Sequence, residues 1–283
     1  MKVVKTAAEA TAASLAAKRS GKVIGLVPTM GSLHDGHRSL VRRARDECDF
    51  VSVSIFVNPT QFSEGEDLET YPRALKRDLV LCDEDGVDLV LTPSNEEMYL
   101  DGHTSWIEVG GLTQRLEGIT RPSHFRGVTT VVAKLFNIFL PDFAYFGQKD
   151  LQQCAIIMRM ARDLNFPVKI VRCPIVREDD GLAMSSRNSR LSPEERKAAS
   201  CLHEALKGFA EETVAGETDA GRLIETMAEI IIAEPLAELD YAAIIDPETL
   251  EDVQEVRGPV AAAVAAWVGQ TRLIDNVIVT PED

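Results

Sequence analysis

The first half of the chain alternates short apolar runs with segments of helical periodicity. Apolar runs of strand length predict buried strands, and they lie at 23–27, 50–57, 88–91, 143–146 and 168–171. Between them, apolar residues recur three or four positions apart, which predicts helices at 36–48, 71–84, 127–139 and 150–164. In the second of these helices, Leu75, Leu79 and Cys82 share one stripe. This alternation is typical of βαβ units and predicts an α/β, Rossmann-like parallel sheet with helices on both faces.

The pattern changes at about residue 177. Ser192, Pro193 and Glu195 match an N-cap, a first-turn proline and the closing residue of a capping box, so we expect a long helix to begin there. Later apolar runs at 239–245, 260–267 and 273–279 predict antiparallel strands. We therefore expect a Rossmann-like domain over 1–176 and, over 177–283, a smaller C-terminal α+β lid domain with a short antiparallel sheet.

Charge and cysteine usage narrow the class of protein. Thirty Lys and Arg against forty-five Asp and Glu give a net charge of −15, which disfavours nucleic acid and anionic membranes as partners. No apolar run reaches the roughly 20 residues of a membrane span, and the start of the chain lacks a signal-peptide pattern. The cysteines are five in number and widely spaced, which favours free, buried thiols. We expect a soluble cytoplasmic protein.

The most informative motif, PTMGSLHDGH at 28–37, lies between the first core strand and the next helix. Ligands of parallel sheets bind at the carboxyl ends of the strands, and a turn that begins a helix directs N–H groups toward anions such as phosphate. His34 and His37 are three positions apart and can face one side, where each would donate a hydrogen bond to phosphate. The alternatives are capping or surface histidines, or a metal site that lacks a third ligand.

Two further strand ends carry polar side chains. Asn58 and Gln61 follow the second core strand, and their neutral amides suit hydroxyls and carboxylates, although the segment also fits an ordinary Asn-Pro turn. The motif FGQKD at 146–150 places Lys149, a mobile positive charge, at a strand-to-helix turn. Asp150 would cap the helix or orient a metal-bound water, and Gln153 shares its helix face. A solvated lysine is the alternative.

The segment MSSRN at 184–188 precedes the first helix of the C-terminal domain. Two hydroxyls and a guanidinium can clamp phosphates around a transferring group. Such loops are also common on protein surfaces. Its place at the expected domain junction makes it a candidate for a closing lid.

Taken in order, these motifs resemble the pantoate–β-alanine ligase family. The resemblance runs from about residue 23 to 196 and also includes SIFVNPTQF, YPR at 71–73, HFRGV at 124–128 and GLAMSSRN. The last hundred residues match in length and in their helix-then-strand pattern. The first motif is also similar to the HIGH element of nucleotidyltransferases, and MSSRN occupies the place of their KMSKS-like loop.

The resemblance implies an ATP-dependent condensation of (R)-pantoate with β-alanine through a pantoyl adenylate, releasing AMP and pyrophosphate. It implies catalytic roles for His37, His34, Lys149 and Arg187. It implies a homodimer paired through the N-terminal domain, and Mg²⁺ that accompanies ATP without an assigned protein ligand. Gln61 and Gln153 would bind pantoate, and Gln61 would also meet β-alanine. The residues that would bind ATP are Met30, Gly31, Ser32, Leu33, His34, Asp35, Gly36, His37, Gly147, Gln148, Lys149, Asp150, Val176, Met184, Ser185, Ser186 and Arg187. Many family members have Glu where this chain has Gln148, and we expect little effect from that difference.

Elementary chemistry agrees with that reaction. A carboxylate with a pKa of about 4 is already an ionised nucleophile at pH 7, whereas an amine with a pKa of about 10 must attack in its minority neutral form. The first step therefore needs positioning and cationic stabilisation rather than a base. Two alternatives stay open at this point: a nucleotidyltransferase that leaves AMP attached to its product, and a nucleotide-binding regulatory module without turnover.

Overall fold

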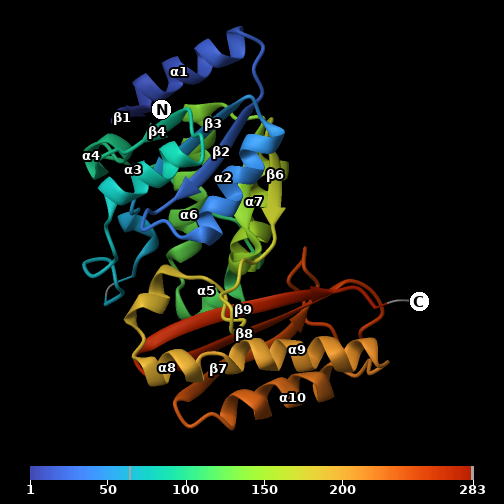
Figure 1. Cartoon of the computed structure of the whole chain (residues 1–283). Helices are drawn as coiled ribbons and strands as arrows, with labels where there is room; N and C mark the ends of the chain where they lie inside the picture. Colours follow the sequence, from blue (N-terminus) through green and yellow to red (C-terminus); the bar gives the residue numbers. More distant parts are fainter. Residues whose placement is uncertain (64, 282–283) are drawn as a thin grey trace. The chain divides into compact units, whose positions relative to one another are not determined.

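The computed structural model describes residues 1–63 and 65–281, and it divides into two compact units (Figure 1). The first unit contains Met1–Gly147 and Gln152–Pro174, and the second contains Gln148–Leu151 and Ile175–Asp283. The short segment Gln148–Leu151 therefore packs with the second unit, although the first unit flanks it in sequence. Among the described residues, none of the helices is both long enough and apolar enough to cross a membrane.

The first unit is built on a parallel sheet, as predicted. Its described strands are β1 (Lys2–Val4), β2 (Ile24–Thr29), β3 (Phe50–Ile55), β4 (Leu89–Leu91), β5 (Phe143–Gly147) and β6 (Lys169–Cys173). They are ordered β1-β4-β3-β2-β5-β6, and every neighbouring pair is parallel. The sequence pattern located five of these strands to within a few residues but gave no indication of β1.

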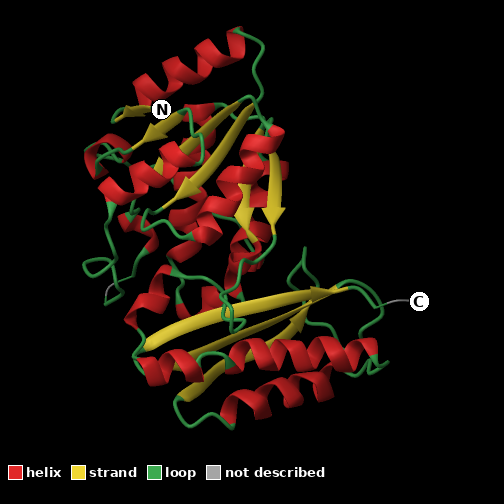
Figure 2. Ribbon diagram, viewed as in Figure 1, coloured by secondary structure: helices red, strands yellow, loops and turns green. Residues whose placement is uncertain are grey.

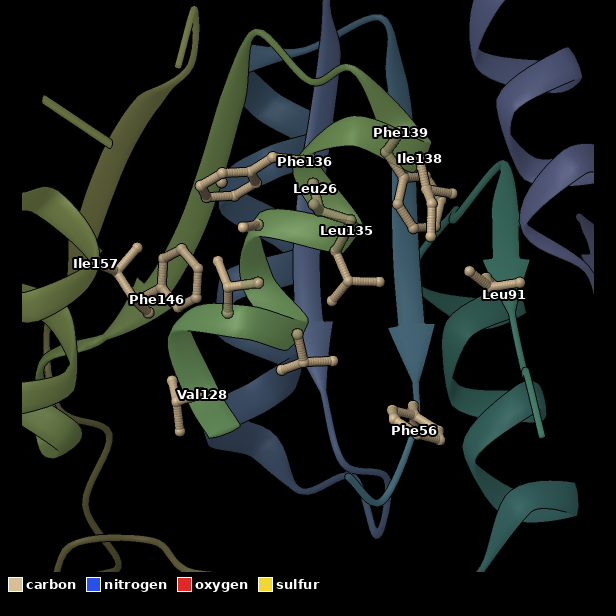
Figure 3. Packing of buried hydrophobic residues seen from close by; sticks show 14 of the residues in the cluster. Leu26, Phe56, Leu91, Val128, Leu135, Phe136, Ile138, Phe139, Phe146 and Ile157 are labelled. Carbon is tan, nitrogen blue, oxygen red and sulfur yellow. The ribbon is translucent and has the colours of Figure 1, made fainter. Parts of the chain in front are cut away.

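Helices cover both faces of this sheet (Figures 1 and 2). The apolar cluster on one face includes side chains of α1 (Ala7–Arg19), α6 (His124–Phe139) and α7 (Leu151–Asp163). The cluster on the other face includes side chains of α2 (Asp35–Glu47) and α3 (Leu75–Glu84). Successive strand residues alternate between the two clusters, because side chains of a strand point to opposite faces: Leu26 lies in the first and Val27 in the second. Figure 3 shows α6 packed across the sheet through Leu135, Phe136 and Phe139.

Strand register brings three loops to one edge of this sheet. Thr29, the last residue of β2, pairs with Ile55, the last residue of β3. Leu26 also pairs with Ala144 of β5, and β5 ends three residues later at Gly147. Because the strands are parallel, the segments that follow all three residues leave the sheet at its carboxyl edge, where ligands of such sheets bind.

The second unit contains helices and an antiparallel sheet (Figure 2). Its described elements are α8 (Pro193–Ala198), α9 (Cys201–Val214), α10 (Ala220–Ile232), β7 (Ala237–Ile245), β8 (Val260–Val268) and β9 (Thr271–Val279). The strands pair antiparallel, as predicted, and their order is β7-β8-β9. Leu206, Phe209, Leu223 and Met227 of α9 and α10 pack with buried residues of β8, such as Val264, to form a core.

One helix prediction was wrong. The capping box of Ser192 and Glu195 is present, with Pro193 at the first position. The helix that it begins is short, however, and ends at Ala198. The hydroxyl of Ser200 donates to the carbonyl of Lys197 at 2.8 Å, and the Ser200 N–H donates to that same carbonyl at 3.3 Å. These i→i−3 bonds tighten the backbone and separate α8 from α9.

The cysteines match the prediction of free, buried thiols. All five are buried and none forms a disulfide. Burial raises the pKa of the Cys82 thiol to about 12 and that of Cys173 to about 11. At neutral pH both side chains are therefore protonated, and they act as small apolar residues.

The short helices α4 (Asn95–Met98) and α5 (Glu117–Thr120) lie in the connection between β4 and α6. Gln152 of α7 holds this connection by donating to the carbonyls of Leu112 and Arg115 at 2.8 and 2.7 Å. Its side-chain oxygen accepts the N–H of Glu117 at 3.0 Å. A buried glutamine whose donor and acceptor are both used fixes a segment that has little regular structure of its own.

Candidate active site

The loop between β2 and α2 has an unusual backbone. Gly31 and Ser32 both have positive φ angles, 84° and 52°, and the second is rare for a residue with a side chain. Thr29 supports the turn from below, because its hydroxyl donates to the carbonyl of Ser54 at 2.8 Å and accepts the N–H of Gly31 at 3.2 Å. The motif therefore leaves the sheet as a sharp turn before α2 begins at Asp35.

A buried carboxylate holds the same loop from the other side. Asp78 of α3 is only 1% exposed, and its two oxygens accept the N–H groups of Ser32 and Leu33 at 2.9 and 2.8 Å. A Cβ atom at Gly31 would lie 3.1 Å from one of these oxygens, so the loop approaches the carboxylate closely. These two amides point at Asp78, and the Leu33 side chain is buried in the core.

Asp78 was not identified from the sequence. The predicted apolar stripe of α3 contained Leu75, but Leu75 is 44% exposed and Asp78 is buried instead. A signal was present, since Asp78 lies four positions before the buried Cys82 and therefore on the same helix face. A charged residue on the buried face of a helix indicates a specific partner.

The two histidines of the motif lie side by side at the start of α2. Their ring centroids are 4.1 Å apart, and the N–H of His34 points at Nδ1 of His37 at 3.4 Å. His34 is the N-cap residue, so both rings lie at the positive end of the helix dipole. The structure thus places the predicted pair together, where an anion would meet two imidazoles and a helix N-terminus.

The segment after β3 brings Gln61 next to the histidine loop. Asn58 precedes the 3₁₀ helix Pro59–Gln61 and Gln61 ends it, and the two residues are only 1% and 7% exposed. The Asn58 amide donates to Oε1 of Gln61 at 3.0 Å, and Nε2 of Gln61 lies 3.2 Å from the sulfur of Met30. Two predicted site residues from different strand ends, Met30 and Gln61, are therefore in contact. Asn58 supports Gln61 from behind.

The motif HFRGV has a clear physical role beside Gln61. At Gly127 of α6, a Cβ atom would lie 2.4 Å from the carbonyl oxygen of Thr60, so only glycine permits this approach. His124 and Arg121 approach the carbonyl oxygen of Gln61 through Nδ1 at 2.9 Å and a guanidinium N–H at 3.3 Å. The start of α6 thereby fixes the backbone that carries Gln61.

Gln153 and Lys149 lie in different units. Gln153 is half-buried on the first turn of α7, within the first unit. Lys149 belongs to the second unit, in the 3₁₀ turn Gln148–Asp150 that directly follows β5. Its ammonium group lies 3.8 Å from the carboxylate of Asp150, with the side chain 21% exposed. The carbonyls of Gln148 and Lys149 accept hydrogen bonds from Asn276 of β9.

The MSSRN segment forms an anchored loop within the second unit. The hydroxyl of Ser185 accepts the N–H of Arg187 at 3.2 Å, which caps the 3₁₀ helix Ser186–Arg190. The Asn188 amide donates to Glu178 at 2.8 Å, and the N–H of Met184 donates to the carbonyl of Val176 at 3.0 Å. The two predicted site segments at 176 and 184–187 are therefore neighbours.

An ion-pair network supports this loop. Arg196 of α8 donates to Glu178 at 2.6 Å and to Asp180 at 2.9 Å. The hydrogen bond from Arg196 holds the pKa of the Asp180 carboxyl below its usual value. Glu178, bound on one side by Arg196 and on the other by Asn188, links the first helix after the loop to the loop itself.

No group of three or more His, Cys, Asp or Glu side chains that could hold a metal ion occurs within residues 1–63 and 65–281. The described residues do provide hydrogen-bond donors. The first unit places His34 beside His37 and brings the Gln61 amide into contact with Met30, and the second holds Lys149 in one turn and 184–187 in another. Side-chain donors at the carboxyl edge of a Rossmann-like sheet are typical of α/β enzymes that use nucleotides, and the chain is of this class.

Comparison with known proteins identifies the family. The model of the pantoate–β-alanine ligase family matches residues 2–278. The pantothenate synthetase of Thermoanaerobacter sp. (strain X514) is 54% identical over 261 residues, 92% of either chain. The crystal structure of pantothenate synthetase from Thermus thermophilus superposes with a TM-score of 0.94 at 47% identity, covering 99% of this chain and 100% of that one. The chain belongs to the pantoate–β-alanine ligase family, as its motifs predicted, and its activity is the ligation of pantoate to β-alanine.

A second similar structure is a complex with ligands. It is the pantoate–β-alanine ligase from Francisella tularensis complexed with "Beta-gamma ATP" and β-alanine, with a TM-score of 0.81 and 33% identity over 98% of this chain and 97% of that one. Family membership therefore supports an ATP-using ligase. It does not support the alternative of a nucleotidyltransferase that leaves AMP on its product.

Proposed function

We propose that the chain joins pantoate to β-alanine in two steps through a pantoyl adenylate. In the first step a carboxylate oxygen of pantoate attacks the α-phosphorus of ATP, a new O–P bond forms, and the bond to pyrophosphate breaks. In the second step the neutral amine of β-alanine attacks the acyl carbon, the bond to AMP breaks, and the amine loses a proton. One ATP is thereby converted to AMP and pyrophosphate for each amide formed.

The observation that carries this proposal is the histidine pair at the start of α2. The ring centroids are 4.1 Å apart at the positive end of a helix, beside the loop that contains Met30. Phosphate gains negative charge during the attack, and donors fixed in advance stabilise that charge most. We assign His37 and His34 to the phosphates that react, and Met30, Gly31, Ser32, Leu33, Asp35 and Gly36 to the walls of the ATP site.

Two further cations, Lys149 and Arg187, belong to this proposal. Lys149 brings a point charge and Arg187 a planar fork of donors, and both suit phosphate oxygens. We assign the rest of the ATP site to Gly147, Gln148, Asp150, Val176, Met184, Ser185 and Ser186. The amides of Gln61 and Gln153 are assigned to pantoate, with Gln61 also meeting β-alanine. A neutral amide can bind a carboxylate without reducing its charge, so pantoate stays nucleophilic.

We propose further that Mg²⁺ accompanies ATP without an assigned protein ligand; when bound, it would supply positive charge that offsets the negative charge of the phosphates. We also propose that the chain forms a homodimer through its N-terminal unit and acts in the cytoplasm. The dimer follows from the family resemblance, and the cytoplasmic location is supported by the free, buried thiols. Sedimentation at micromolar concentration tests the dimer, since a single species with the mass of one chain would refute it.

The decisive test of the site is the variant His37→Ala. We expect kcat to fall by roughly 10²-fold or more, as for the loss of one donor that stabilises a transition state. Arg43→Ala is the matched control, because Arg43 lies on the same helix and pairs with Glu47 at 2.9 Å outside the proposed site. Pantothenate and AMP are measured together. Turnover of His37→Ala equal to that of the control would refute the assignment, and amide formed without equimolar AMP would refute the two-step reaction.

A further inference from the structure

The turn that carries Lys149 is attached to the last strand of the chain. Asn276 of β9 is 3% exposed, and its amide nitrogen donates to two successive carbonyl oxygens, those of Gln148 and Lys149, both at 3.0 Å. Its side-chain oxygen accepts a hydrogen bond from the Gln148 amide at 3.3 Å. One buried side chain therefore binds the peptide carbonyls on both sides of the Lys149 Cα.

Asn276 is itself held rigidly. Its N–H donates to Oδ1 of Asp275 at 2.7 Å. Asp275 is 2% exposed and accepts both arms of the Arg177 guanidinium, at 2.6 and 3.1 Å. Arg177 also donates to the carbonyl of Gly181 at 2.9 Å. A two-bond Arg–carboxylate pair is geometrically specific, so the β9 backbone at Asn276 has a fixed position.

The same network also holds the 184–187 loop, the other segment of this unit that we assign to the ATP site. Arg177 directly follows Val176 in sequence, and it forms an isolated antiparallel bridge with Ala183. Next to that bridge, the N–H of Met184 donates to the carbonyl oxygen of Val176 at 3.0 Å. The turn at 148–150 and the loop at 184–187 are thus both built on the Arg177–Asp275–Asn276 cluster, although Asn276 lies 127 residues after Lys149 along the chain.

We propose that Asn276 is a positioning residue for the reaction, which acts by fixing the backbone from which Lys149 reaches the phosphates of ATP. This rests on the role proposed for Lys149. A long, flexible side chain delivers its charge accurately only if its Cα is fixed, because small displacements of a charged donor cost much of its effect. Asn276 supplies that constraint through two donated hydrogen bonds that no apolar residue can replace.

The test compares Asn276→Ala with Val268→Ala. Val268 is buried at the far end of β8 and lies outside the proposed machinery, so it controls for simple weakening of the sheet. In Asn276→Ala we expect faster amide hydrogen exchange in the peptide that contains residues 147–151, and a fall in kcat of roughly 10- to 100-fold. In Val268→Ala we expect exchange and kcat near those of the unchanged chain at a temperature where both variants are folded.

Two further measurements separate the outcomes. In the Lys149→Ala background, Asn276→Ala should cause little additional loss, because residues that act as a unit are not additive. Asn276→Ser, which retains one donor, should recover part of the lost kcat. Full additivity with Lys149→Ala, or unchanged exchange at 147–151 in Asn276→Ala, would overturn the inference. If Lys149→Ala has normal kcat while Asn276→Ala still loosens the turn, positioning of the turn is supported and the role proposed for Lys149 fails.

Discussion

Asp78 offers the sharpest test of how the histidine loop is held. Its carboxylate accepts one buried N–H, from Leu33 at 2.8 Å, and one partly buried N–H, from Ser32 at 2.9 Å. The loop has two successive residues with positive φ, a conformation that costs a residue with a side chain about 1–3 kcal/mol and persists only when its surroundings enforce it. Without the carboxylate, we expect the loop to relax.

The magnitude follows from the two bonds. Asp78→Ala leaves two N–H groups without their acceptor, at roughly 1–3 kcal/mol each. Since water can reach the N–H of Ser32, the lower half of the range applies there, and the expected loss of unfolding free energy is about 2–5 kcal/mol. Asp78→Asn retains one acceptor oxygen and directs an NH₂ group toward the second N–H. Its expected loss is about 1–3 kcal/mol, smaller than that of the alanine variant.

Urea denaturation followed by circular dichroism measures these losses, and steady-state kinetics measures the Michaelis constant for ATP. We expect both Asp78 variants to raise that constant by roughly tenfold, because the displaced loop carries the proposed phosphate donors. Asp83→Asn is the matched control. It lies on the same helix with its side chain 70% exposed, so the same chemical change should leave stability and kinetics near normal.

One result would refute this role of Asp78. Burying a carboxylate costs free energy that its hydrogen bonds must offset. If Asp78→Asn proved more stable than the unchanged chain while binding ATP equally well, the carboxylate would be a net burden rather than a support. The histidine loop would then keep its shape without the charge of Asp78.

Three other substitutions test separate parts of the structure. Gly127→Ala should displace the Gln61 loop, lower stability by about 1–3 kcal/mol and raise the Michaelis constant for pantoate, whereas Gly110→Ala, where an added Cβ meets nothing within 4 Å, should do neither. Burial raises the pKa of the Asp85 carboxyl, but the hydrogen bonds and charge of Arg38 oppose this rise. Together with Arg42 they outweigh it, so the pKa in the folded state lies below the ordinary value. That pair therefore stabilises the fold above pH of about 4 and loses its effect as the pH falls through the folded value, so Asp85→Asn should be less stable at pH 7 and less sensitive to acid in denaturation experiments. Gln153→Ala should mainly raise the Michaelis constant for pantoate, and an unchanged value would remove Gln153 from that site.

Much of the fold could be predicted because the parallel sheet of the first unit has an apolar core on each of its two faces. In β2, Leu26 and Val27 face different helices, and both must be apolar. Such strands appear in the sequence as short continuous runs. The first helix, Ala7–Arg19, was not predicted, since alanine predominates in it and its buried residues are only Ala10, Ser14 and Ala17. A helix that buries small side chains has little contrast between its faces.

Some residues of the candidate site could likewise be predicted from the sequence, and others could not. His34, His37, Gln61 and the lysine turn could be proposed from the sequence because each follows a strand and belongs to a local motif. Asp78 was missed because its partners lie 45 and 46 residues earlier in the chain. Short-range periodicity cannot report a side chain that acts on distant backbone, although the buried helix face of Asp78 carried a usable signal.

The residues that hold the loops differ from the residues proposed to touch substrate, and the difference has a chemical reason. In the proposed reaction pantoate needs no base, so what the protein contributes is the fixed geometry of its donors. Three loops of the described residues are each held by a buried polar or glycine contact from another element: the histidine loop by Asp78, the Gln61 loop by Gly127, and the lysine turn by Asn276. Each acts chiefly on the backbone of its loop. A substitution at one of them should therefore displace a whole set of donors at once, and its effect on kcat should be lost when the donor that it serves has already been removed.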